Sequence, residues 1–109
     1  FGEAITDDYR GTFFAANPDL QGQVIVHHAV EQQVLTRYPG LVSTTEVHSL
    51  ENLRGIPTEL NSDIHLSKIR REWNEFYRKT PSPTKEMLLQ KATEIDKKFG
   101  SQFIPPRGK

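Results

Sequence analysis

Two segments in the second half of the chain carry apolar residues at helical spacing, and they constrain the fold more than any other feature. Each repeats an apolar side chain every three or four residues, which aligns them on one face of a helix. The stripes are Leu66, Ile69, Trp73 and Phe76 in the first segment, and Leu88, Ala92, Ile95 and Phe99 in the second. The sequence therefore predicts two amphipathic helices, and we expect Trp73, Phe76 and Tyr77 to belong to the core.

Residue types that are common at the ends of helices flank both segments. Asn61, Ser62 or Asp63 is positioned to cap the first helix, since all three residue types are favoured before a helix. The sequence TPSP over residues 80–83 separates the helices, with Ser82 as the predicted N-cap of the second and Pro83 in its first turn. Gly100 is the predicted end of that second helix. We therefore place the last helix within residues 82–100.

The first half of the chain has weaker periodicity. Residues 1–22 mix apolar and turn residues, which predicts an irregular or short-strand lead-in. The β-branched run over residues 23–26 predicts a strand, and helical spacing over residues 29–38 predicts a helix that ends at Pro39-Gly40. Residues 41–56 resemble short extended pieces around a turn. These elements together predict a helix-rich α+β fold with a small sheet.

Composition limits the architecture and the chemistry. A chain of 109 residues suits a single domain. The absence of cysteine excludes disulfides, thiolate metal sites and a cysteine nucleophile, so any metal must be held by His, Asn or carboxylate groups. No apolar run approaches the roughly 20 residues needed to span a bilayer, and we expect no membrane partner. Because the chain begins with Phe1, we expect it to be cut from a longer polypeptide.

The net charge of zero hides a strong asymmetry. Before His65 the chain has nine acidic and three basic residues, a net charge of −6, whereas from His65 onward it has eleven basic and five acidic residues, a net charge of +6. A basic surface of this kind favours binding to nucleic-acid phosphates. The alternative is that these lysines and arginines merely solvate two amphipathic helices.

Histidines are the residues most able to carry chemistry here. The adjacent His27 and His28 lie between the predicted strand and the predicted helix, where both rings could reach one concavity, and Asn52 and His65 follow downstream. Hydrolysis of a phosphodiester requires a cation for the phosphate charge, a base for water and a group that orients the base. Imidazole near neutral pH serves as ligand or base. We expect His48 to be a loop residue and Asn61 a helix cap.

Three segments resemble the HNH and endonuclease VII superfamily. They are VHH over residues 26–28, NLRGIP over residues 52–57 and IHLSKIRREWNEFY over residues 64–77. The resemblance covers about half the chain and implies a ββα-metal core over residues 23–78 with additional helices. It is strongest to C-terminal toxin domains of bacterial polymorphic toxins, including Rhs-repeat proteins, in which a larger effector carries a short toxin at its end.

The resemblance also implies roles for individual residues. His28 matches the general base, His27 and His65 match metal ligands, and Asn52 matches the catalytic-site Asn that fixes the loop and orients the base. Related domains often have a further helical His where this chain has Lys68 and Ile69. Fewer protein ligands favour a labile Mg²⁺ or Mn²⁺ over Zn²⁺ or Ni²⁺.

We therefore expect a metal-dependent endonuclease, with DNA favoured over RNA as substrate. Three basic residues lie close to the motif in the sequence and are therefore candidate phosphate contacts: Arg54, Lys68 and Arg71. The resemblance further implies a cognate immunity protein and a secreted effector, as in type VI secretion, that acts in the cytoplasm of a target cell.

Other functions are compatible with the same residues. A metal-independent ribonuclease toxin would use two histidines as acid and base. A non-catalytic module would bind nucleic acid or an acidic protein through its basic helices. An ADP-ribosyl transferase fits less well, because the sequence predicts too few strands for its usual sheet-rich architecture.

Overall fold

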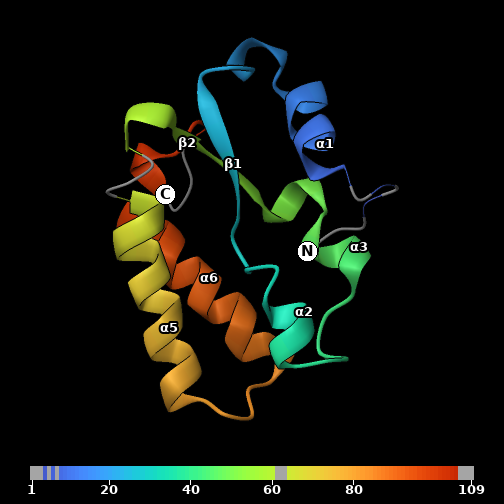
Figure 1. Ribbon diagram of the computed structural model, residues 1–109, viewed down its shortest axis with the longest axis vertical. Coiled ribbons are helices and arrows are strands. Elements are labelled where there is room, and N and C mark those ends of the chain that lie inside the picture. The colour runs from blue at the N-terminus through green and yellow to red at the C-terminus, as the bar shows by residue number, and fades with distance from the viewer. Residues whose placement is uncertain (1–3, 5, 7, 61–63, 106–109) are drawn as a thin grey trace.

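The computed structural model describes residues 4, 6, 8–60 and 64–105, and the side chains of residues 64–66 lie outside this description. The chain has the predicted α+β class and is rich in helix (Figure 1). Its α-helices and strands are α1 (Tyr9–Ala16), β1 (Val24–His28), α2 (Val34–Arg37), α3 (Thr44–Val47), β2 (Leu53–Pro57), α5 (Arg70–Lys79) and α6 (Lys85–Phe99). The 3-10 turns are η1 (Pro18–Leu20), η2 (Leu50–Asn52), η3 (Thr58–Leu60) and η5 (Gly100–Gln102), and η4 (Ile64–Ile69) is a π-helix that leads into α5.

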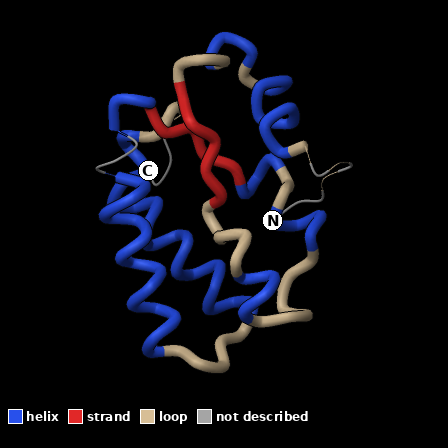
Figure 2. The backbone as a smooth tube through the Cα atoms, viewed as in Figure 1, coloured by secondary structure: helices blue, strands red, loops and turns tan. Residues whose placement is uncertain are grey.

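The two strands form an antiparallel pair in the middle of the molecule, with α1 on one side and α5 and α6 on the other (Figure 2). Val24 and Val26 of β1 pack with Phe13 of α1. Ile56 of β2 belongs instead to the larger core around Trp73. The sheet is therefore covered on both faces, and each face packs against its own cluster of apolar side chains.

Helix α1 corrects the prediction of an irregular lead-in over residues 1–22. Asp8 caps it by accepting a hydrogen bond from the backbone N–H of Gly11 at 3.1 Å. Phe13 is its one buried residue among those described, and it packs where β2 has Gly55. A Cβ at Gly55 would lie 2.9 Å from the Phe13 ring and would also meet the carbonyl oxygen of Ile104. Long-range packing, rather than local periodicity, therefore positions α1.

The segment between the strands is more helical at its end and less helical at its start than predicted. The helix expected over residues 29–38 is confined to α2, because the backbone of Ala29 and Val30 bonds to Asn52 instead of continuing a helix. The prediction of extended pieces over residues 41–56 is wrong where the chain forms α3. That helix begins with a capping box, in which Ser43 and Glu46 each bind the other's backbone N–H.

Helices α5 and α6 confirm the two predicted amphipathic helices. Ile69, Trp73, Leu88 and Ile95 are all buried in one core. The N-cap of α6 is Thr84 rather than the predicted Ser82, since its hydroxyl accepts from the backbone N–H of Met87 at 3.2 Å. The predicted caps Asn61, Ser62 and Asp63 and the side chain of Leu66 lie outside the description. Gly100 ends α6 as predicted.

No helix among the described residues is long and apolar enough to cross a membrane.

A buried ion pair joins the sheet to the last helix. Two guanidinium nitrogens of Arg54 in β2 donate to the carboxylate of Asp96 in α6, at 3.1 and 2.9 Å. Arg54 also donates to the carbonyl oxygens of Glu51 and Leu53, at 2.8 and 2.9 Å. The two side chains are 7% and 13% exposed. The pair therefore anchors α6 to the start of β2.

Replacing Asp96 by Ala should lower the free energy of unfolding by about 3–5 kcal/mol, because Arg54 would keep a buried charge without its carboxylate. Glu94→Ala is the matched control on the same helix, since Glu94 is 55% exposed and lies 3.7 Å from Lys91. It should cost less than about 1 kcal/mol. Urea unfolding measures both, and equal losses would show that the pair does not anchor α6.

Candidate active site

The two adjacent histidines of β1 lie on opposite faces of the sheet. His27 is opposite Arg54 in the strand pairing, and His28 is opposite Leu53. Directly opposed residues of an antiparallel pair share a face. His27 therefore lies on the face that packs toward α5 and α6, whereas His28 lies on the face covered by α1. Both are buried, with 4% and 5% of their surface exposed.

His28 is enclosed by three side chains from separate parts of the chain. Its Nε2 lies 3.1 Å from Nδ1 of His48, within hydrogen-bond distance. Its Nδ1 lies 3.5 Å from the amide nitrogen of Gln32. The ring of Tyr9 in α1 meets it edge-on, with ring centroids 4.3 Å apart. The imidazole of His28 is thus contacted at both of its nitrogens, and His48 is the closer partner.

His48 also belongs to this cluster. It lies in the turn that follows α3, in agreement with the predicted loop position, but the sequence pattern does not predict its contact with His28. It is only 6% exposed, and its ring stacks on that of Tyr9 with centroids 5.4 Å apart and planes inclined by 7°. The sequence pattern predicts neither α1 nor α3, and therefore does not predict that these rings meet. The one available signal was the capping box of Ser43 and Glu46, which predicts the helix that ends at His48.

Asn52 fixes the loop that follows His28. Its side-chain oxygen accepts from the backbone N–H of Val30 at 2.9 Å. Its side-chain nitrogen donates to the carbonyl oxygens of Val30 at 3.1 Å and Val47 at 2.8 Å. These contacts match a loop-fixing role and involve the backbone next to both His28 and His48. Because these bonds go to the backbone of Val30 and Val47, we expect Asn52 to act on the ring of His28 through the loop.

A surface hollow of about 280 Å³ lies along β1 and is lined by both histidines. Both residues border it, although their side chains lie on different faces of the sheet, so the two rings do not converge on one concavity as the sequence predicts. Tyr9 and Arg10 of α1 also line the hollow, together with Glu31 and Gln32 of the segment that follows β1. Arg10 is exposed, and its guanidinium lies 4.8 Å from the centroid of the Tyr9 ring. The hollow therefore combines imidazoles with a cation at the surface.

Glu31 is the carboxylate of this hollow. It accepts hydrogen bonds from the hydroxyl of Tyr77 at 2.7 Å and from Gln33 at 2.6 Å. Burial raises the pKa of Glu31, and these two hydrogen bonds oppose that shift. Burial also raises the pKa of Tyr77, and the neighbouring Glu31 adds to it. Tyr77 therefore stays a hydrogen-bond donor to Glu31 at neutral pH.

The three predicted phosphate contacts differ in position. Arg54 is buried and committed to Asp96, so it is not the exposed phosphate contact expected from the motif. Lys68 in η4 and Arg71 in α5 are exposed. They belong to the helical layer on the His27 side of the sheet, whereas Arg10 lies at the hollow.

The predicted metal site is described in part. His27 lies on the sheet face toward α5, and η4, which contains His65, leads directly into that helix. The side chain of His65 lies outside the description. Within the described part of the chain, no group of three or more His, Asp or Glu side chains is arranged to hold a metal ion. Two imidazoles from His27 and His65 would leave most coordination positions to water and substrate oxygens.

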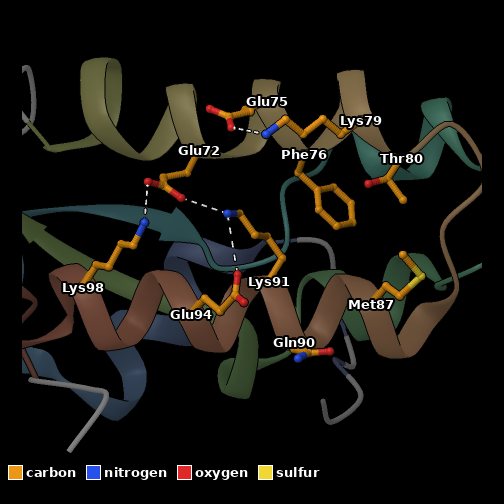
Figure 3. Close-up of a pocket in the computed structure, with 10 residues that line it drawn as sticks. All are labelled: Glu72, Glu75, Phe76, Lys79, Thr80, Met87, Gln90, Lys91, Glu94 and Lys98. Carbon is orange, nitrogen blue, oxygen red and sulfur yellow. Dashed lines mark hydrogen bonds and ion pairs between the residues drawn. The ribbon is translucent and has the colours of Figure 1, made fainter.

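A second and larger hollow, of about 570 Å³, lies between α5 and α6 (Figure 3). The carboxylate of Glu72 forms ion pairs with the ammonium groups of Lys91 and Lys98, both at 2.8 Å. The carboxylate of Glu75 pairs with Lys79 at 2.7 Å. These charges compensate one another within the hollow. Among the histidines whose side chains are described, His27, His28 and His48, none lines this hollow, so we place the candidate chemistry along β1.

No family model, curated protein or solved structure matches the chain. The resemblance to the HNH superfamily therefore stays a prediction from the sequence motifs.

Replacing Asn52 by Ala should destabilise the fold by several kcal/mol, because it leaves three buried backbone groups without a partner at about 1–3 kcal/mol each. Asn17→Ala is the matched control, since Asn17 is half-buried and donates one hydrogen bond, to Phe13. It should cost about 1 kcal/mol. Thermal or urea unfolding measures the difference. Equal effects would mean that Asn52 does not hold the loop.

Proposed function

We propose that this chain is a metal-dependent endonuclease in which His28 is the general base, with DNA favoured over RNA as its substrate. The observation that carries the proposal is the setting of His28. Its imidazole is oriented by His48 and Gln32 beside a hollow that also holds Arg10, and the following loop is fixed by Asn52. This arrangement supports the roles that the motif implies for His28 as the base and for Asn52 as the residue that fixes the loop.

In the proposed reaction, His28 takes a proton from a water molecule. The resulting hydroxide attacks phosphorus, the bond from phosphorus to the leaving oxygen breaks, and that oxygen takes a proton from solvent. A divalent ion held by His27 and His65 would stabilise the negative charge on the phosphate and the leaving oxygen. Arg10 at the hollow replaces Arg54 as the proposed phosphate contact, because Arg10 is exposed and Arg54 is not.

The biological setting belongs to the proposal as well. By its resemblance to polymorphic toxins, we propose that the chain is the toxin part of a larger secreted effector that acts in the cytoplasm of a target cell. A cognate immunity protein would protect the producing cell. The acidic first half and basic second half offer such a partner charge of either sign.

A metal-independent ribonuclease is the second candidate, and one contact favours it. His28 and His48 bring two imidazoles together in one place, with Nε2 and Nδ1 at 3.1 Å. Such a pair supplies an acid and a base for a reaction in which the RNA 2′-hydroxyl is the nucleophile. Sensitivity to EDTA and the choice of substrate distinguish this candidate from the first.

Purified protein should cleave plasmid DNA with Mg²⁺ or Mn²⁺ and lose this activity in EDTA. His28→Ala and His28→Asn should each lower the rate by at least about 10²-fold, the usual contribution of a general base. Matching thermal unfolding curves would show that the variants are folded. RNA cleavage that persists in EDTA would favour the ribonuclease, and full activity in both variants would exclude His28 as the base.

Arg10→Gln should weaken binding of DNA to the inactive His28→Asn protein and reduce its salt dependence. Loss of one phosphate contact lowers the slope of log affinity against log salt concentration by about 0.9. Arg78→Gln is the matched control, because Arg78 is an exposed arginine on α5 that does not line this hollow. Fluorescence anisotropy at several salt concentrations measures both. Identical slopes for the two variants would remove Arg10 from the phosphate contacts.

A further inference from the structure

Contacts of its own main chain, of Asn52 and of Tyr9 position His48 against His28. It is the C-cap residue of α3, and its backbone N–H donates to the carbonyl oxygen of Thr44 at 3.0 Å. Asn52 binds the carbonyl oxygen of the preceding Val47. Its ring is stacked on Tyr9. The ring of His48 is therefore packed between Tyr9 and His28, and its main chain is tied to α3.

The proposed role of His28 gives its contacts a direction. Its Nε2 faces His48, so a base at this position needs its lone pair on Nδ1, and the side-chain nitrogen of Gln32, a donor 3.5 Å from Nδ1, is compatible with that lone pair. A neutral imidazole with its lone pair on Nδ1 carries its hydrogen on Nε2. In that tautomer Nε2–H of His28 would donate to Nδ1 of His48, 3.1 Å away. The donors would then run from Gln32 through His28 to His48.

We propose that His48 is a positioning residue that holds His28 in the form with hydrogen on Nε2 and a lone pair on Nδ1. This inference rests on the proposed function, in which His28 is the base. The Gln32 contact is at the long limit for a hydrogen bond, so a water molecule in the hollow can replace it. The lone pair of Nδ1 then accepts the proton of that water.

The same geometry stabilises the product of the proton transfer. When His28 has accepted a proton on Nδ1, its Nε2–H remains directed at the lone pair of His48, and a hydrogen bond from a charged donor is stronger than one from a neutral donor. His48 does not touch the substrate in this scheme. Its whole effect passes through the orientation and the tautomer of His28.

Nuclear magnetic resonance tests the pair directly in the wild-type protein labelled with ¹⁵N. We expect a scalar coupling across the hydrogen bond between Nε2 of His28 and Nδ1 of His48, with the proton attached to His28. A proton attached to Nδ1 of His48, or no coupling between the two nitrogens, would overturn the inference. This measurement does not require nuclease activity.

Kinetics test the consequence with two replacements of His48. His48→Phe keeps a ring to stack on Tyr9 but removes the acceptor, and should lower kcat about 100-fold with KM unchanged, the cost of misplacing a catalytic group. His48→Asn restores an acceptor near the position of Nδ1 and should recover most of that loss. Equal thermal unfolding midpoints of the two variants would show that packing is not the cause.

The outcomes separate this inference from the proposed function. Cleavage that requires His28 but is equally fast in His48→Phe would keep the nuclease and overturn the role of His48. A folded His48→Asn protein that is as slow as His48→Phe would also overturn it, because the acceptor would then not be what matters. Absence of cleavage by the wild-type protein would remove the proposed function, and the catalytic role of His48 with it.

Discussion

The side-chain amide of Asn52 closes the long connection between the two strands, and the candidate site depends on this closure. Its hydrogen bonds reach Val30, just after β1, and Val47, at the end of α3, while its own backbone leads into β2. Burying an amide costs free energy unless its hydrogen-bonding groups find partners. Here they find partners that bring the segments of His28 and His48 together. An apolar residue of similar size could fill the space but could not join these three segments.

Much of the fold was predictable where the signal is local. The stripes that include Trp73 and Leu88 gave both long helices, because helical spacing reports a buried face directly. Helix α3 was missed although Ser43 and Glu46 form a capping box, a signal present in the sequence itself. Helix α1 offered no comparable pattern. Its position follows from Phe13 packing at Gly55, and no window of local sequence contains both residues.

The candidate site divides in the same way. The order of His28 and Asn52 in the chain suggested their roles, and the structure brings their segments into contact. The environment of His28 was not predictable, because His48 and Tyr9 reach it from separate helices. Proximity in sequence was misleading for Arg54, whose partner Asp96 lies far along the chain in α6. A charged residue next to a motif can bind substrate only if it does not already form a buried ion pair within the fold.

The alternation of β1 gives two identical side chains different surroundings. His27 lies toward the C-terminal helices and His28 toward α1, and the pairing with β2 decides which is which. A slip of one residue would exchange the two faces and the apolar residues with them. The steric need for a glycine opposite Val26 opposes such a slip, since Gly55 is the position where Phe13 and Ile104 approach the strand. The surroundings of each histidine thus depend on Gly55, a residue that has no side chain.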